Sequence, residues 1–298
     1  MIQPNYLQPK DTVAIVSTAR KITLKEIQPA ISLLESWGLK VIIGDTIGLE
    51  DNQFAGTDAQ RAADFQQMLD NPTIKAIWCA RGGYGTVRIV ESLDFTQFKK
   101  QPKWVIGYSD ITVLHNQIHS FGIETLHALM PIDISKSTEK AIKSLKKCLF
   151  SNAISYEIPT SEINRKGNTR GEFIGGNLSI LYSLLGSDSS LKTVGKILFI
   201  EDLDEYLYHI DRMMMNLKRN GYFDNLKGLV VGSMTDMHDN TVPFGKNAYQ
   251  IISDIVAEYN FPVAFNFPAG HIKDNRGLIL GRHVNFDVNG KVVKLSFL

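Results

Sequence analysis

A serine stands at a predicted sharp turn in the segment VIGYSDITVLH, residues 105–115. The apolar residues before Gly107 are typical of a buried strand, and the apolar spacing afterwards predicts a helix from about Asp110. Ser109 could be a nucleophile, because its oxygen would project from the bend beside backbone N–H groups able to hold an oxyanion. It could equally cap the helix, although Asp110 is as good a cap and stands nearer to it. Ile111 replaces the second glycine of the usual G-x-S-x-G hydrolase motif, so the turn alone leaves both interpretations open.

A serine nucleophile needs a base, and the base needs an acid that orients it. Among seven histidines, His271 lies in the segment FPAGHIKDNRG, which has no helical or strand periodicity, and loops often carry functional residues. His115 and His119 lie four residues apart on one predicted helix, as in the zinc motif H-E-x-x-H. Asn116 occupies the glutamate position of that motif and no third ligand is evident, so we predict no metal site.

Four acidic residues follow the predicted strand in GKILFIEDLDEY: Glu201, Asp202, Asp204 and Glu205. The last residue of a strand can point into a cleft at the edge of the sheet, which suits Glu201 as the orienting acid. The four carboxylates could instead bind a divalent cation together. A third possibility, which suits Asp204 and Glu205, is that they stabilise the N-terminus of the following helix.

The glycine-rich segment ARGGYGT follows another predicted strand. It contains Gly83-x-Gly85, but Arg88 stands where the G-x-G-x-x-G motif needs its last glycine, and a Walker lysine and threonine are absent. Nucleotide binding is therefore weakly supported. Glycines let backbone N–H groups approach a ligand closely, so this loop could face Ser109 and supply an oxyanion donor. Arg81 could bind a substrate carboxylate or brace the loop.

The first half of the chain has the pattern of alternating strands and helices that forms a parallel sheet. Predicted strands fall at 11–19, 39–45, 74–80 and 103–109, and helical patterns at 23–38, 58–72, 86–94 and 110–122. In such sheets, sites gather where the carboxyl ends of strands meet the N-termini of helices. Both the glycine-rich loop and the Gly-Tyr-Ser-Asp turn belong to that edge.

The second half begins after a polar, poorly periodic stretch at about 151–170, which we interpret as a linker. Beyond it the sequence predicts a glycine turn opening a helix, a strand ending near Glu201, and a long helix over 205–221. Asn289-Gly290 lies between two alternating segments, which indicates a hairpin. We therefore predict an N-terminal domain over 1–150 and a mixed α/β domain over 171–298.

Composition narrows the functional classes. The chain has 298 residues, which suits two domains, with 44% hydrophobic and 21% charged residues. There are 32 basic and 31 acidic residues and no block of like charges, so we expect no nucleic-acid partner. No 18-residue apolar run and no signal-peptide pattern is present, and Cys79 and Cys148 do not suggest a disulfide framework. We expect a cytoplasmic protein with no membrane partner.

Five segments taken together resemble the LD-carboxypeptidase family of serine peptidases, which includes murein tetrapeptide carboxypeptidases and microcin-C immunity proteins. The segments are AGTDAQRAADFQQMLDNPTIKAIWCARGGYG, GYSDIT followed by LH, GGNLSIL, IEDLDEYLYHIDRM and the Gly-His pair at 270–271. They occur in the family's order from about residue 55 onward, so the resemblance covers most of the chain.

The resemblance implies a catalytic triad of Ser109, Glu201 and His271. It places the oxyanion donors on the backbone N–H groups of Gly83 and Asp110. It also implies a flavodoxin-like N-terminal domain, a smaller and partly barrel-like C-terminal domain, no cofactor and a homodimer. Two residues beside these motifs, Arg81 and Tyr108, are our candidates for substrate binding.

The activity implied is that of a carboxypeptidase that cleaves the bond before a terminal D-amino acid. Its expected substrate is a murein tetrapeptide that loses D-alanine during cell-wall recycling. A non-catalytic ligand-binding module, with Ser109 as a cap, is the alternative from another class. The chain departs from the usual family sequence at Ala128-Leu129, at His209 and over 272–281, and these positions bear on which peptide is accepted.

A second alternative is an immunity-type peptidase acting on aminoacyl-nucleotide conjugates. Such members resemble one another in carrying tryptophan on the loop before the Gly-Gly-Asn turn, where it can stack on a base. Here Trp37, Trp78 and Trp104 all precede that loop, and Phe173 is the sole aromatic residue of 161–173. Three cations occupy this stretch instead: Arg165, Lys166 and Arg170. We therefore predict a preference for an acidic peptide over a nucleotide conjugate.

Overall fold

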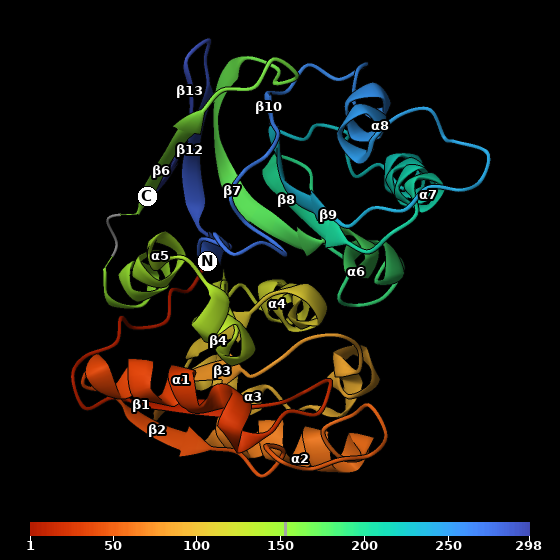
Figure 1. The fold of residues 1–298 in the computed structure, drawn as a ribbon. Coiled ribbons are helices and arrows are strands. Elements are labelled where there is room, and N and C mark those ends of the chain that lie inside the picture. The colour runs from red at the N-terminus through yellow and green to blue at the C-terminus, as the bar shows by residue number, and fades with distance from the viewer. Residues whose placement is uncertain (152–153) are drawn as a thin grey trace.

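The computed structural model describes residues 1–151 and 154–298, which form two α/β parts, each built on its own sheet. Figure 1 shows the N-terminal part below and the C-terminal part above, with α4 (Thr112–Ser120) and α5 (Glu139–Phe150) between them. No helix in the described ranges is long and apolar enough to cross a membrane.

The N-terminal sheet has a flavodoxin-like core of five parallel strands in the order β2-β1-β3-β4-β5. These strands are β1 (Thr12–Val16), β2 (Lys40–Ile43), β3 (Ile74–Cys79), β4 (Trp104–Gly107) and β5 (Thr125–His127). The strand order reverses between β1 and β3, so a crevice for ligands is expected at the carboxyl ends of these two strands. The predicted parallel sheet is confirmed.

A strand from the far end of the chain completes this sheet. β11 (Leu278–Leu280) pairs antiparallel with β5, so the C-terminal part contributes an edge strand to the N-terminal part. The sequence did not indicate this pairing, because three apolar residues after a long loop carry no information about their distant partner.

The helices of the N-terminal part begin at well-formed caps. These helices are α1 (Leu24–Ser36), α2 (Asp58–Asp70) and α3 (Thr96–Lys100), besides α4 and α5. Thr23 and Thr57 each form a capping box, with Glu26 and Gln60 respectively, which satisfies two orphan backbone donors in each case.

The helix predicted over 86–94 is wrong, since the chain forms two short 3₁₀ turns there, Thr86–Arg88 and Val90–Ser92. Long-range contacts set this conformation. The Thr86 N–H donates to Asp110 Oδ2 at 2.9 Å, and its hydroxyl lies 2.8 Å from that of Thr18. The β-branched residues of this segment also lower its helix propensity.

The C-terminal part is built on a mixed seven-stranded sheet in the order β10-β9-β8-β7-β12-β13-β6. Its strands are β6 (Ser155–Pro159), β7 (Gly167–Asn177), β8 (Lys196–Leu203), β9 (Gly228–Thr235), β10 (Val263–Ala264), β12 (His283–Val288) and β13 (Val292–Phe297). Strands β7 to β10 are parallel and the others antiparallel. In the described residues the outer side of β10 makes only a single bridge, from Val263 to Arg165, and β6 ends the sheet on the other side, so no barrel closes there. The hairpin predicted at Asn289-Gly290 is confirmed, and so is the predicted two-part α/β fold class.

The stretch interpreted as a linker, 151–170, carries β6 and the first residues of β7; residues 152–153 lie outside the described ranges. In β6 only two of five side chains, Tyr156 and Ile158, point inward, so its alternation is too short to stand out.

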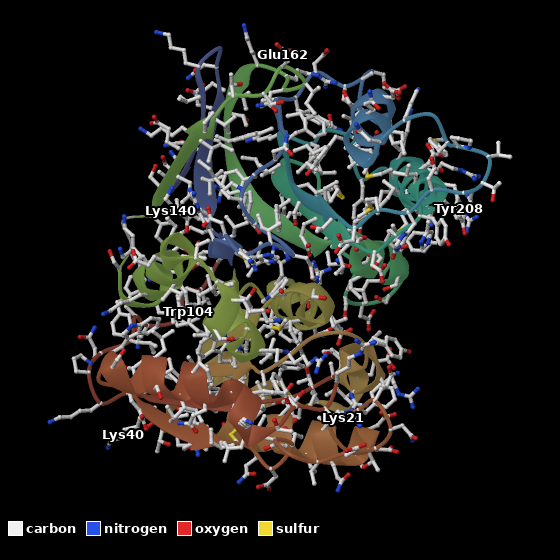
Figure 2. The ribbon with its side chains drawn as sticks, in the orientation of Figure 1. Lys21, Lys40, Trp104, Lys140, Glu162 and Tyr208 are labelled. Carbon is white, nitrogen blue, oxygen red and sulfur yellow. The ribbon has the colours of Figure 1, made fainter. Side chains whose placement is uncertain are left out.

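Three helices cover one face of β8 and β9: α6 (Leu178–Ser183), α7 (Leu207–Arg219) and α8 (Ala248–Ile255). A hydrophobic core cluster is shared between the two parts of the molecule. It includes Trp104 and Leu145 from the first part and Phe199 and Leu280 from the second. Figure 2 shows Trp104 between α1 and α5. This continuous core holds the two sheets in one arrangement and fixes the shape of the cleft between them.

Candidate active site

A cleft of about 560 Å³ lies where the carboxyl edge of the N-terminal sheet meets the ends of β7 and β8. Both parts of the chain line it. The N-terminal part contributes Arg20, Arg81, Gly82, Gly83, Tyr108, Ser109, Asp110, Met130, Ile132, Asp133 and Lys136; the C-terminal part contributes Asn177, Ser179, Ile180, Asp202, Leu203, Asp204, Glu205 and His271. The structure thus brings Ser109 and His271 to one cavity, while Glu201 lies fully buried behind it.

Ser109 has a backbone φ of 62°, in the left-handed region that non-glycine residues seldom adopt. Such strain of about 1–3 kcal/mol is commonly found at functional sites. Neither the first turn at Ser109–Ile111 nor α4 has a side-chain cap, so Ser109 does not cap the helix here. A Cβ on Gly82 would lie only 3.2 Å from the Ser109 Cβ, which explains why this loop needs a glycine beside the serine.

His271 is oriented by a buried carboxylate. Its Nδ1 lies 2.7 Å from Glu201 Oε2, and the Glu201 side chain is 0% exposed. Because a carboxylate accepts, Nδ1 carries the hydrogen and Nε2 is left to accept a proton. Gly270 makes this pair possible, since a Cβ there would lie 2.6 Å from Glu201 Oε2. Its φ of 109° also favours glycine, which accounts for the Gly-His pair.

The charge state of His271 depends on that pair. Burial disfavours the charged ring, but the charge and hydrogen bond of Glu201 outweigh it, so the pKa of His271 is raised above 6.5. A base must be neutral to accept a proton, so activity should fall as the pH drops through this raised value.

We therefore expect kcat/KM to show an acid limb with an apparent pKa above 6.5. Glu201→Gln should move this limb to lower pH and reduce the plateau, because the main contribution that opposes burial is removed. The measurement is a pH–rate profile. Glu172→Gln is the matched control, since Glu172 forms an ion pair with His119 away from the cleft. An unmoved acid limb in Glu201→Gln would show that another group controls the ionisation.

The Gly-Gly-Asn motif ends β7 and holds the acidic end of β8. The Asn177 side-chain amide donates to Asp202 Oδ1 at 2.9 Å and to Glu201 Oε1 at 3.3 Å. A Cβ on Gly175 would lie 1.9 Å from the Phe199 carbonyl oxygen, and one on Gly176 would lie 2.5 Å from the Thr112 hydroxyl. Bare backbone at both positions therefore lets β7 pack against β8 and α4.

The four carboxylates at the end of β8 and just after it do not converge on one point, as a cation site would require. Glu201 faces His271, and Asp202 accepts from Asn177 and from the Ser179 N–H. Burial, together with the charge of Glu201, raises the pKa of Asp202 to about 7. Asp204 pairs with His238, and Glu205 pairs with His209 in the first turn of α7.

The histidines of the zinc-like pattern also separate. His115 Nε2 bonds the Gly107 carbonyl at 2.9 Å inside the core, and His119 pairs with Glu172 of β7, which also pairs with Lys196 at the start of β8. Within 1–151 and 154–298, no group of three or more His, Cys, Asp or Glu residues is arranged to hold a metal ion.

Sequence reasoning missed a buried arginine that supports the glycine-rich loop. The Arg61 guanidinium is fully buried and donates to the carbonyl oxygens of Thr18, Gly85 and Gly56, and it pairs with Asp58. Its signal was present, because Arg61 lies on the apolar face of α2, four residues before Phe65.

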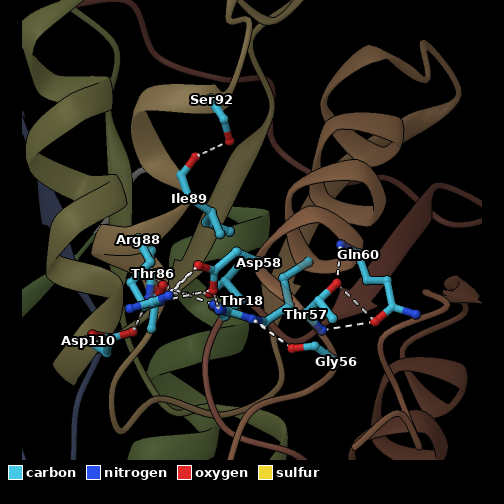
Figure 3. A network of polar contacts seen from close by, with 12 residues as sticks. Thr18, Gly56, Thr57, Asp58, Gln60, Thr86, Arg88, Ile89, Ser92 and Asp110 are labelled. Carbon is cyan, nitrogen blue, oxygen red and sulfur yellow. Dashed lines mark hydrogen bonds and ion pairs between the residues drawn. The ribbon is translucent and has the colours of Figure 1, made fainter. Parts of the chain in front are cut away.

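Asp110 supports the same loop from the opposite side. Its carboxylate accepts from the Thr86 N–H, and Arg88 bonds Asp58 at the outer end of the same network (Figure 3). Burial raises the pKa of Asp110. The side chain of Asp110 therefore has a structural contact that the family resemblance, which concerns its backbone N–H, did not include.

The two candidate substrate-binding residues have different surroundings. The Tyr108 ring lies 4.8 Å from the His271 ring, and its hydroxyl interacts with Asp133, which also lines the cleft. Arg81 lines the cleft but donates from Nη1 to the Lys21 carbonyl at 3.3 Å. Tyr108 therefore packs against the histidine, and Arg81 braces the chain that follows β1.

The cations expected to attract an acidic peptide do not line this cleft. Arg165 donates to the carbonyl oxygens of Val256 and Phe261, and Arg170 lies in β7 opposite Asn285. Phe173 is buried against Phe199 and is not available for stacking on a ligand. The prediction that 161–173 forms a cationic substrate loop is wrong, because most of that stretch is a strand and its turn. The cations of the cleft are Arg20, Arg81 and Lys136.

The departures from the usual family sequence lie around this cleft and not at its serine. Ala128 and Leu129 are buried, and the Leu129 carbonyl accepts from the Trp78 indole at 2.7 Å. Within 272–281, Asn275 accepts from the Gly270 N–H at 2.9 Å and β11 joins the first sheet. This segment thus supports the loop that carries His271.

A two-domain α/β fold whose cleft holds a serine at a strained turn, together with a histidine bonded to a buried carboxylate, is typical of serine hydrolases. Comparison with known proteins identifies the family. The model of the LD-carboxypeptidase N-terminal domain matches residues 13–128, and that of the LD-carboxypeptidase C-terminal domain matches residues 170–286. The chain belongs to the LD-carboxypeptidase family.

Relatives and solved structures agree with this assignment. The "Probable murein peptide carboxypeptidase" of Bacillus subtilis is 35% identical over 289 residues, covering 94% of this chain and 89% of the relative. The Microcin C7 self-immunity protein MccF of Escherichia coli is 26% identical and covers 96% and 93%. The crystal structure of muramoyltetrapeptide carboxypeptidase from Oxalobacter formigenes has a TM-score of 0.88 at 25% identity, covering 96% and 98%.

Proposed function

We propose that this protein is a serine carboxypeptidase that releases the terminal D-alanine of a murein tetrapeptide in cell-wall recycling. The observation that carries the proposal is the 2.7 Å contact between His271 and the buried Glu201, at a cleft that also contains Ser109. Membership of the family and the names of the murein peptide relatives support a carboxypeptidase role.

The proposed reaction uses only groups of this chain. His271 Nε2 takes the proton of Ser109, whose oxygen attacks the carbonyl before the terminal residue. The amine of that residue leaves with the proton from His271. Water, activated by the same base, then hydrolyses the acyl-enzyme.

The backbone N–H groups of Gly83 and Asp110 are the proposed oxyanion donors. Among the hydrogen bonds of the residues described, neither N–H has an acceptor, so both are free to donate to a ligand. Their positions are supported from behind by Arg61 and by the Asp110 carboxylate. Donors held in place before the reaction stabilise a developing charge without reorganisation.

A labelling experiment separates the enzyme from a non-catalytic binding module. A fluorophosphonate should form an adduct on Ser109 of the purified protein, and the adduct should be absent in Ser109→Ala. Mass spectrometry of the digested protein locates the label. Inertness of the wild-type chain, under conditions that label a control hydrolase, would favour the binding module.

Substrate choice gives a second test. We expect a higher kcat/KM for murein tetrapeptide than for an aminoacyl-nucleotide conjugate, because the cleft offers little for a base to stack on. Its sole aromatic lining residue in the described ranges is Tyr108, which is 7% exposed and packed on His271. Stacking on an open aromatic ring would be worth about 1–3 kcal/mol per base. A clear preference for the nucleotide conjugate would instead support an immunity-type peptidase like its relative MccF.

A cytoplasmic location and a homodimer belong to the same proposal; the location is expected from the composition of the sequence, and the homodimer is implied by the family resemblance. Analytical ultracentrifugation of the purified chain measures the second, and fractionation of producing cells measures the first.

A further inference from the structure

The crevice at the strand-order reversal between β1 and β3 holds a cation that the proposed reaction leaves without a role. Arg20 follows β1, and Gly82 and Gly83 follow β3, so all three lie at the edge where doubly wound sheets bind ligands. The Arg20 backbone is fixed, because its carbonyl accepts from the Ser17 hydroxyl at 2.7 Å and it bridges to Phe54.

The Arg20 side chain lies across the bare backbone of Gly83. A Cβ on Gly83 would lie 2.5 Å from Arg20 Cδ and 2.9 Å from Arg20 Nε, so only glycine leaves room for this arrangement. In the described part of the chain, nothing accepts a hydrogen bond from the Arg20 guanidinium and no carboxylate pairs with it. A guanidinium free to make a bidentate contact therefore lines the cleft.

Of the other two cations of the cleft, Arg81 is already engaged and Lys136 lies toward a neighbouring cavity. Arg81 bonds the Lys21 carbonyl, and its charge acts on Glu26 at the start of α1. Lys136 has no hydrogen bond or ion pair in the described ranges, but it also lines a neighbouring cavity of about 460 Å³ beside Ile272. Arg20 is the cation with the most direct path to a ligand bound at Gly83.

Neighbouring residues of the loop lie beside Ser109 and beside Arg20. Gly82 contacts Ser109, and the next residue, Gly83, contacts Arg20. One residue of an extended chain spans about 3.5 Å, so a scissile carbonyl at Ser109 and a carboxylate at Arg20 would be separated by about one residue.

We propose that Arg20 binds the terminal carboxylate of the substrate peptide and thereby restricts cleavage to the last residue. The inference rests on the proposed function, because it assigns the subsite for the leaving D-amino acid. It replaces Arg81 with Arg20 as the residue that recognises the carboxylate.

The test compares murein tetrapeptide with the same peptide ending in D-alaninamide. Binding is measured by calorimetry in the Ser109→Ala background, so that it does not depend on turnover. We expect this background to bind the free acid about 10- to 100-fold more tightly than the amide, as a charge-assisted bidentate contact allows. Adding Arg20→Gln should abolish most of this preference by weakening only the acid.

Lys21→Gln is the matched control, since Lys21 is the neighbouring exposed cation and pairs with Glu50. It should leave the acid-to-amide ratio unchanged, and a thermal melt should show that Arg20→Gln remains folded. Arg20→Lys should restore part of the preference, because lysine keeps the positive charge but cannot make the bidentate contact of a guanidinium. In otherwise wild-type enzyme, Arg20→Gln should raise KM for the acid more than it lowers kcat.

The inference is overturned if Arg20→Gln keeps the full preference for the acid, or if Arg81→Gln is the variant that loses it. Failure of the proposed function gives a different result, namely no D-alanine released by the wild-type chain. The binding ratio is measured independently of that release, so the two failures are distinguishable.

Discussion

Ser109→Ala should lower kcat/KM for murein tetrapeptide on the order of a thousandfold or more, with little change in melting temperature. His271→Ala and Glu201→Ala should have losses of similar size, because in the proposed mechanism the three side chains act as one unit in moving a single proton. Removal of Glu201 also leaves His271 without the hydrogen bond that fixes its tautomer. Steady-state kinetics and thermal melts of the three variants provide the measurement.

Controls for these variants come from residues of the same types outside the cleft. Ser183→Ala removes an exposed hydroxyl that bonds only the Ile180 carbonyl, and His238→Ala removes an exposed partner of Asp204. Both should retain activity. His115 lies in the core and bonds Gly107. If His115 nevertheless proves essential and His271 dispensable, the assignment of the base is wrong.

The sequence was sufficient to predict elements whose signals are local. The strands and most of the helices up to residue 122, the hairpin at Asn289-Gly290 and the sharp turn at Ser109 all depend on neighbouring residues. The strand β11 and the 3₁₀ turns after Gly85 could not be predicted in this way. Their conformation depends on partners such as β5 and Asp110, which are far away in the sequence.

The residues of the candidate site show the same difference between local signals and contacts that are distant in the sequence. Ser109, Glu201 and His271 were selected because each stands at the end of a strand or in a loop, and the structure brings their segments to one cleft. The cationic role predicted for 161–173 is wrong, because the sequence shows which residues are charged but not where their side chains point. The Arg165 side chain points toward backbone carbonyl oxygens of the C-terminal part. Arg20, which was not predicted to bind a ligand, lies over Gly83.

Arg61 shows why a polar residue on an apolar helix face merits attention. Three backbone carbonyls, from Gly56, Thr18 and Gly85, depend on its buried guanidinium for their hydrogen bonds. Gly85 belongs to the loop that carries Gly83, and Thr18 contacts Thr86 at the end of that loop. Because the loop is rich in glycine, it has little conformational preference of its own and needs these external contacts.

Arg61→Met should therefore damage both stability and catalysis. Orphaned buried carbonyls should cost about 2–4 kcal/mol in the free energy of unfolding, measured by urea denaturation. A displaced Gly83 N–H should reduce kcat about a hundredfold in the protein that remains folded. Arg88→Met is the matched control, because Arg88 pairs with the same Asp58 but its side chain is 47% exposed. An exposed ion pair is worth about 0–1 kcal/mol, so this control should change neither quantity much. Equal losses in the two variants would show that the ion pair with Asp58, and not the carbonyl contacts of Arg61, maintains the loop.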